Sequence, residues 1–140
     1  MPVEIRTHKK FSSLVERARV LRVARKTLRA EKCTGSFTVY VTTDAEIRKL
    51  NRQFHATDAP TDVLSFPTGI DNYIGDIVVS YDRAKVQARQ AGWRIADEID
   101  LLVVHGILHL LGYDDLMPRK RAKMWKRQEE ILGRVAGVRS

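Results

Sequence analysis

The segment HGILHLLGYDD, residues 105–115, holds the residues of this chain with the clearest capacity for chemistry. It contains two of the four histidines in the sequence, His105 and His109, within an otherwise apolar run. On a helix, side chains four residues apart share a face, with Cβ atoms about 6 Å apart, so both imidazoles can reach one ion. The spacing therefore predicts a helical metal site of the kind that binds zinc.

A third ligand is expected from the acidic pair that closes the segment. Gly112 is predicted to end the helix and reverse the chain, which brings Asp114 and Asp115 back toward the histidines. Two histidines and one carboxylate form an established zinc ligand set that leaves the fourth position open. The pattern H-x-x-x-H-x-x-G-x-x-D favours Asp115 as the ligand. Asp114 is expected to cap the turn or to support a ligand.

The residue after the first histidine decides between classes of zinc enzyme. Zinc peptidases with this spacing place a glutamate there as the general base, whereas this chain has Gly106. A peptidase is therefore disfavoured, although a metal could still polarise a phosphoryl oxygen. The facial triad of an iron oxygenase also uses two histidines and a carboxylate, but a helix is not its usual location, so this alternative ranks low.

The net charge of +8 is unevenly distributed along the chain. Residues 1–32 hold ten Lys and Arg against three acidic residues, whereas residues 33–115 hold seven against twelve. Residues 116–140 hold eight against two. Basic surfaces concentrate polyanions through counterion release, so the two basic flanks favour a nucleic-acid partner. The alternative is that these are solvated helix faces, which are often basic for solubility alone.

The length of 140 residues predicts one domain, residues 1–140, with a sizeable core. The longest apolar run, around residues 101–111, falls far short of the roughly 20 residues that a membrane span needs. A single cysteine, Cys33, excludes an intrachain disulfide and is typical of a reducing compartment. We therefore expect a cytoplasmic protein without a membrane segment.

Hydrophobic periodicity predicts strands and helices mixed within one α/β (α+β) domain. The expected strands are residues 3–7, 36–43, 61–67 and 74–81, of which the third is expected to stop at Pro67. The expected helices are residues 11–30, 43–54, 82–90, 95–111 and a last helix that starts at Pro118. The fold is thus expected to be a small mixed four-stranded sheet packed with about five helices, with the metal site at the end of a central helix.

Three blocks of the sequence resemble the YbeY family, metal-dependent endoribonucleases that mature ribosomal RNA. HGILHLLGYDD is similar to the family signature H-G-x-L-H-L-x-G-Y-D-H. LNRQFHATDAPTDVLSFP, residues 50–67, is similar to L-N-x-x-Y-R followed by T-D-V-L-S-F-P, and GDIVVS, residues 75–80, to the strand G-D-I-x-I-S. The blocks stretch from Leu50 to Asp115, and the helices predicted on either side fall where the family has them.

The resemblance implies that His105 and His109 are the first two metal ligands. Asp115 occupies the place of the third ligand, which the family usually fills with histidine, and an aspartate there lowers the net charge of the site by one. It could weaken the Lewis acidity of the metal or change which metal is preferred. His55 falls where the family usually has an arginine thought important for cleavage. A histidine can contact phosphate when protonated, or carry a proton, but it does not copy an always-charged guanidinium. The alternative for His55 is a surface residue near a helix end.

The function implied by the resemblance is a single-strand-specific metallo-endoribonuclease, acting in 16S rRNA 3′-end maturation and late ribosome quality control. Zinc is the expected cofactor, one ion per chain, with nickel or another divalent metal as alternatives. The implied partners are ribosomal RNA and components of the small ribosomal subunit. Candidates to hold the RNA backbone are Arg22, Arg25, Lys120 and Arg121. The alternative function is a non-catalytic ribosome-assembly factor with a structural metal site, and the oligomeric state is not predicted.

Overall fold

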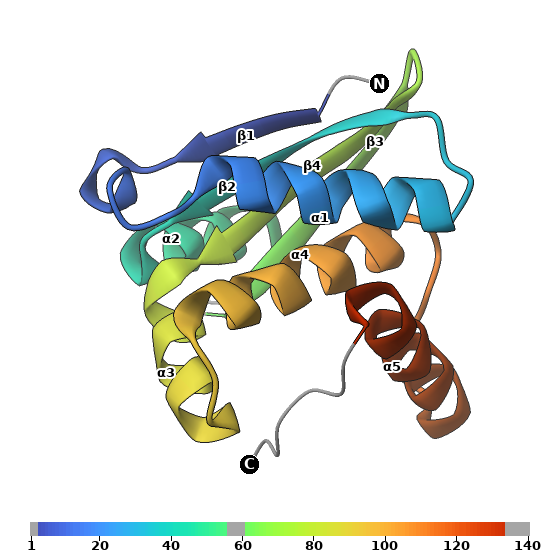
Figure 1. Ribbon diagram of the computed structural model, residues 1–140. Coiled ribbons are helices and arrows are strands. Elements are labelled where there is room, and N and C mark those ends of the chain that lie inside the picture. The colour runs from blue at the N-terminus through green and yellow to red at the C-terminus, as the bar shows by residue number, and fades with distance from the viewer. Residues whose placement is uncertain (1–2, 56–60, 134–140) are drawn as a thin grey trace.

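The computed structural model describes residues 3–55 and 61–133, and every structural statement below concerns these residues. The strands are β1 (Val3–Thr7), β2 (Ser36–Thr42), β3 (Val63–Ile70) and β4 (Tyr73–Ser80). The helices are the 3-10 turn η1 (Lys9–Phe11), α1 (Arg17–Ala30), α2 (Asp44–His55), α3 (Tyr81–Ala91), α4 (Ile95–Leu110) and α5 (Pro118–Leu132). Four strands and five α helices in one unit confirm the predicted fold class (Figure 1).

The four strands form a mixed sheet in the order β1-β2-β4-β3, in which β3 alone runs antiparallel to its neighbour. Parallel neighbours need a crossover connection, which α1 supplies between β1 and β2. β3 and β4 form a hairpin whose turn residues, Asp71 and Asn72, have φ angles of 50° and 64°. Such left-handed pairs match the twist of a two-residue hairpin turn. α1 and α4 cover one face of the sheet, and α2 packs on the other (Figure 1).

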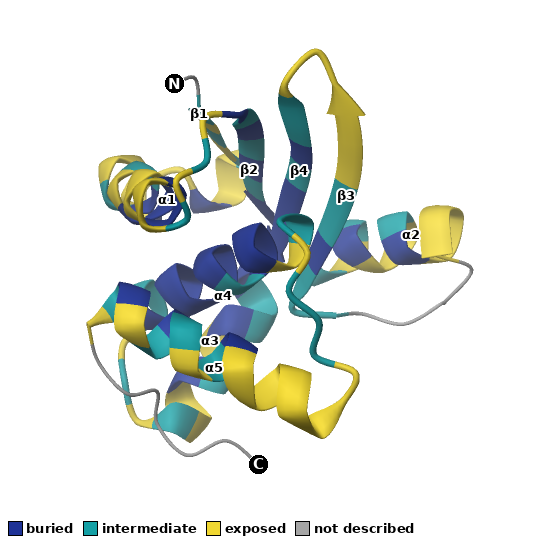
Figure 2. Ribbon diagram, turned by 90° about the vertical axis from the view of Figure 1, so that its right-hand side faces the viewer, coloured by how far each residue is buried: buried dark blue, intermediate teal, exposed yellow. Residues whose placement is uncertain are grey.

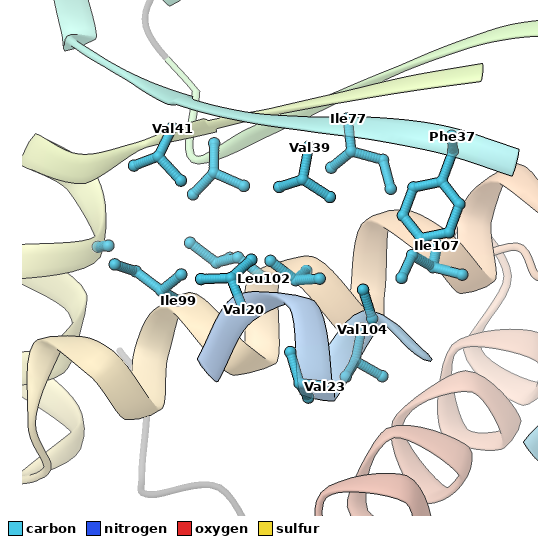
Figure 3. Close-up of a cluster of buried hydrophobic side chains, with 14 of the residues drawn as sticks. Val20, Val23, Phe37, Val39, Val41, Ile77, Ile99, Leu102, Val104 and Ile107 are labelled. Carbon is cyan, nitrogen blue, oxygen red and sulfur yellow. The ribbon is translucent and has the colours of Figure 1, made fainter. Parts of the chain in front are cut away.

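The central helix α4 runs through the main hydrophobic core. Between Asp97 and Leu108 every residue except His105 is buried. Because α4 is enclosed on nearly all sides, its sequence is apolar around the whole helix rather than along one stripe. Figure 3 labels core side chains from α1 (Val20, Val23), the sheet (Phe37, Val39, Val41, Ile77) and α4 (Ile99, Leu102, Val104, Ile107). This packing fixes the direction of the C-terminal end of α4, where the histidines lie.

A buried ion cluster ties α1 to the first turns of α4. Arg19 Nη2 donates to Asp97 Oδ1 and to Asp100 Oδ2, each at 2.8 Å. The hydrogen bond to Asp100 is the largest influence on Arg19 and raises the pKa of its guanidinium. The two helices are therefore joined by charge pairs as well as by apolar contacts. Among the described residues, no helix has the length and apolar character needed to cross a membrane.

The first helix starts later than its periodicity predicted. α1 begins at Arg17 rather than at Phe11, and η1 followed by a turn takes up the intervening residues. Phe11 is buried from that turn, with its ring stacked on Tyr81 at a centroid distance of 4.3 Å. Leu14, three residues after Phe11 and so at helical spacing from it, is 62% exposed. Apolar residues inserted from a 3-10 turn therefore imitated a helical stripe.

The prediction that the third strand stops at Pro67 was wrong. β3 continues to Ile70, with Pro67 paired opposite Gly75 of β4. β3 lies at an edge of the sheet, where proline is tolerated because the missing N–H is not needed on the open side. A register shift between Pro67 and Ile70 accommodates the irregularity before the hairpin turn.

Candidate metal centre

The last turns of α4 carry the two histidines out of the core. His105 is half-buried and His109, one turn later, is exposed. Helix α4 ends at Leu110, and Gly112 follows with a φ of 106°, a conformation that glycine adopts far more readily than other residues. The chain therefore reverses at Gly112 as predicted, which returns Asp115 to the histidines. The His105 Nε2 and Asp115 Oδ2 atoms lie 3.6 Å apart.

The turn that returns Asp115 is held at several points. Asp114 Oδ1 accepts from the Leu116 amide at 2.8 Å, so Asp114 caps the turn as predicted for that residue. Arg121 Nε donates to the Asp115 carbonyl oxygen at 3.0 Å. Tyr113 packs against the main core, where burial, with a smaller contribution from Glu31, raises the pKa of its hydroxyl. These contacts position the backbone of Asp115 and leave its carboxylate directed at His105.

The three predicted ligands line one cavity of about 290 Å³. The cavity is bounded by α2, the start of β3, the end of α4 and the turn after it; its lining residues are His55, Thr61, Asp62, Val63, Leu64, Ser65, His105, His109 and Asp115. Thr61, Asp62 and Ser65 therefore lie at its wall. Figure 2 shows two of the elements that carry lining residues, α2 and α4.

The donor set fits zinc in kind, and one pair of ligands fits in distance. Bonds of about 2.0–2.2 Å in a tetrahedral site place neighbouring ligand atoms roughly 3.3 Å apart, close to the separation of His105 from Asp115. The third donor, His109, lies on the same wall one helical turn away. Within residues 3–55 and 61–133, no three His, Cys, Asp or Glu side chains are already gathered as a metal site. His105, Asp115 and His109 are therefore the residues that would hold a metal here, and the first two already lie close together.

Gln128 of α5 orients His105, and the sequence reasoning missed it. Gln128 Oε1 lies 2.7 Å from His105 Nδ1, and the Gln128 side chain is fully buried. When Nδ1 donates to this oxygen, Nε2 carries no proton and can ligate a metal. One signal was available: Gln128 interrupts the apolar stripe that Met124 and Ile131 form at helical spacing. A polar residue on a buried stripe needs a partner, and here the partner is a predicted ligand.

Gly106, which stands where zinc peptidases have their glutamate base, also has a packing role. A Cβ added to Gly106 would lie 2.7 Å from Cγ2 of Ile77, a fully buried side chain of β4. Ser65 Oγ donates to the Gly106 carbonyl oxygen at 3.3 Å. The glycine thus allows α4 to approach the sheet closely beside the cavity, and no larger side chain fits unless the Ile77 side chain shifts.

His55 lies at the cavity wall, at the C-terminal end of α2. It is exposed, and its ring is 5.4 Å from that of Phe66, tilted by 35°. The structure therefore brings the predicted catalytic candidate into the cavity of His105, His109 and Asp115. His55 is therefore both a surface residue at a helix end and a residue of the cavity wall.

The four basic candidates separate into two groups. Lys120 and Arg121 lie beside the ligand turn, where Lys120 Nζ is 4.0 Å from Asp114 Oδ2. Arg22 and Arg25 instead line a groove of about 630 Å³ between α1 and α5, with none of its lining residues shared with the cavity of the histidines. Figure 2 shows α1 on the opposite side of α4 from α2.

Comparison with known proteins agrees with these features. The family model Endoribonuclease YbeY matches residues 3–136. The chain belongs to the Endoribonuclease YbeY family. Curated YbeY relatives include one from Roseiflexus castenholzii, 38% identical over 94% of this chain and 91% of the relative. Another, from Chloroflexus aurantiacus, is 44% identical over 86% of this chain and 84% of the relative. A solution structure from Thermotoga maritima matches with a TM-score of 0.65 and 30% identity, over 94% of this chain and 90% of that one.

Proposed function

We propose that this protein is a metal-dependent endoribonuclease that cleaves single-stranded RNA. The observation that carries the proposal is one cavity, in a member of the Endoribonuclease YbeY family, that gathers His55, His105, His109 and Asp115. The matched relatives are named endoribonucleases. RNA is accordingly the substrate class, and phosphodiester hydrolysis the reaction.

His105, His109 and Asp115 are the proposed metal ligands, with zinc as the proposed ion. When bound, such a metal supplies a Lewis acid that stabilises negative charge on a phosphoryl oxygen. Gln128 Oε1 is placed to accept a hydrogen bond from Nδ1 of His105, the tautomer in which Nε2 can ligate a metal, and Arg121 holds the Asp115 backbone in place. Two of the proposed ligands, His105 and Asp115, thus lie close together before RNA arrives, which reduces the reorganisation required at the reacting phosphate.

Basic residues near the cavity are proposed to hold the RNA backbone. Lys120 and Arg121 lie beside the ligand turn and are suited to contact phosphates next to the cleaved bond. Arg22 and Arg25 lie on the far side of α4 and are suited to a more distant stretch of a folded RNA. His55 is placed to contact phosphate when protonated, or to carry a proton.

The finer assignment is to ribosomal RNA. We propose that the substrate is a precursor of 16S rRNA, cleaved near its 3′ end in the cytoplasm, with late ribosome quality control as the physiological setting. Small-subunit components are then the natural partners. This assignment rests on the resemblance to the YbeY family.

The proposal is tested with purified protein and a labelled single-stranded RNA, with a duplex of the same sequence as a control. Cleavage of the single strand is expected to stop with a chelator and to return with zinc. A His109→Ala variant is expected to lose both cleavage and metal, whereas Val86→Ala, on the exposed side of α3, keeps both. A His109→Ala variant that cleaves RNA without metal would contradict the mechanism. Protein that binds metal and RNA but never cleaves would instead support the alternative of an assembly factor.

A further inference from the structure

The last turn of α2 presents a phenylalanine to solvent beside the candidate site. Phe54 is 61% exposed, although it directly precedes His55 at the cavity wall. In Figure 2 the exposed end of α2 points away from the core. The apolar side of α2 is buried instead through Ile47, which packs with Leu64 and Val78 in the smaller core cluster. The buried contact of α2 with the sheet therefore comes from Ile47, while most of Phe54 remains exposed.

Three aromatic rings form a row at this point. The Phe54 and Phe66 rings are in edge-to-face contact, with centroids 5.6 Å apart and planes at 73°. The His55 ring is also in contact with the Phe66 ring, and their centroids are 5.4 Å apart. Phe66 sits between its two neighbours in this row and fixes their spacing. We call Phe54, His55 and Phe66 the aromatic row.

The aromatic row separates two hollows of the surface. His55 lines the 290 Å³ cavity that holds the proposed metal ligands. Phe54 and Phe66 line a groove of about 840 Å³ on the opposite face of the sheet from α4. The same groove is lined by Tyr40 and Tyr73. A single strand of RNA that leaves the cavity across the aromatic row therefore enters a groove with further aromatic side chains.

The groove is suited to bind a polyanion, although two carboxylates are among its lining residues. Asp76 accepts a short hydrogen bond from the Tyr73 hydroxyl, and Glu4 accepts from Arg6 Nε at 2.8 Å. Both carboxylates of the lining thus have donors. Arg17, at the first position of α1, adds a second guanidinium to the lining. Phosphates can pass over this lining while bases face the rings.

We propose that the aromatic row is a stacking platform for an unpaired base of the RNA, next to the phosphate held in the metal cavity. Phe54 supplies the exposed ring face, and the groove beyond it receives the following nucleotides. Stacking on aromatic side chains tolerates any base and requires an unpaired one, so the platform selects single strands without selecting sequence. The proposal rests on the proposed function, since it assumes that RNA enters the cavity.

The test measures RNA binding without cleavage, so that it stands apart from catalysis. Metal-free protein, held in chelator, is titrated into a fluorescently labelled single-stranded oligonucleotide, and the dissociation constant is measured. Phe54→Ala is expected to weaken binding roughly 5- to 150-fold, the range for loss of one stacked base. Phe54→Trp is expected to bind at least as tightly as the wild type. Phe54→Leu, which keeps apolar character without a ring, is expected to bind as weakly as the alanine variant. Val86→Ala, another exposed apolar residue, is the matched control and is expected to change nothing.

A series of oligonucleotides with one abasic position each locates the stacked base. In the wild type, removal of one particular base is expected to weaken binding, and in Phe54→Ala the same removal is expected to have no further effect. Equal affinity of wild type and Phe54→Ala, or an unchanged abasic profile, would overturn the platform. Leucine binding as well as phenylalanine would also overturn it, and would indicate an apolar protein contact. If the wild type binds RNA through Phe54 yet never cleaves it, the platform stands and the catalytic proposal fails.

Discussion

Replacing Gln128 with leucine removes the acceptor that orients His105, and we expect the affinity for zinc to fall about 10- to 30-fold. Gln128 Oε1 and His105 Nδ1 are 2.7 Å apart, and the Gln128 side chain is fully buried. Leucine has nearly the same volume and no polar atom. The change therefore tests orientation of the ligand more than packing.

The magnitude follows from two contributions. Because the hydrogen bond is already present without metal, only its strengthening on metal binding counts, and a charge-assisted bond exceeds a neutral one by about 1–1.5 kcal/mol. Without its acceptor the His105 imidazole is free to place the proton on either nitrogen, and only one form can ligate through Nε2. If the two forms are equally populated, only half of the molecules can ligate through Nε2, which lowers the apparent binding free energy by about 0.4 kcal/mol. The sum of about 1.4–1.9 kcal/mol corresponds to a 10- to 30-fold change.

The fold is expected to survive this substitution. Among residues 3–55 and 61–133, Gln128 Nε2 is a buried donor without a hydrogen-bond partner. Leucine removes that unsatisfied donor, so the free energy of unfolding of the metal-free protein is expected to change little. Thermal unfolding in chelator checks this point before any affinity is compared.

The assay is competition with a chromophoric zinc chelator, with two matched variants. Gln128→Glu keeps an oxygen acceptor and is expected to bind zinc at least as well as the wild type. Gln90→Leu changes an exposed glutamine that lines the cavity behind His105, and is expected to have no effect. Zinc affinity of Gln128→Leu equal to that of the wild type would refute the proposed role of Gln128.

Three further predictions concern packing and charge. Gly106→Ala is expected to lower the free energy of unfolding by about 1–2 kcal/mol in urea titrations, because the new Cβ would lie 2.7 Å from Ile77 Cγ2. Unchanged stability would show that the Ile77 side chain shifts without a cost in free energy. Arg19→Leu leaves Asp97 and Asp100 buried without their guanidinium, and a loss of roughly 3–5 kcal/mol is expected by the same method; a loss below about 1 kcal/mol would contradict this. Burial, followed by the Asp76 contact, raises the pKa of Tyr73, so its stabilisation is complete below about pH 10 and is lost as the pH rises through the folded-state pKa. Tyr73→Phe is therefore expected to lose less stability between pH 9 and 11 than the wild type, and an identical alkaline profile would count against the shift.

The sequence predicted most of the architecture because its strongest signals are local. The histidine spacing, the glycine after α4 and the proline that begins α5 each act within one or two turns, and the structure confirms the helix ends they predict. Phe11 and Pro67 misled the prediction because their roles depend on tertiary position: one is inserted from a 3-10 turn, and the other lies on the open edge of the sheet.

Only the part of the candidate site that lies within residues 105–115 was predictable from the sequence. His105, His109 and Asp115 lie within eleven residues, so their placement along one cavity follows from helix geometry and a glycine turn. Gln128 reaches His105 from another helix, across 23 positions of sequence, and that contact depends on how α5 packs on α4. The separation of Arg22 and Arg25 from the cavity has the same cause, since charge along a sequence does not state which side of α4 each flank covers.

The central claim is that His105, His109 and Asp115 together hold one divalent metal ion. Elemental analysis of freshly purified protein, with wild type beside His109→Ala and Asp115→Ala, tests it most directly. Close to one equivalent of metal, zinc foremost, is expected in the wild type, with a large loss in both variants at unchanged folding. Full metal content in both variants, or none in a folded and active wild type, would contradict it.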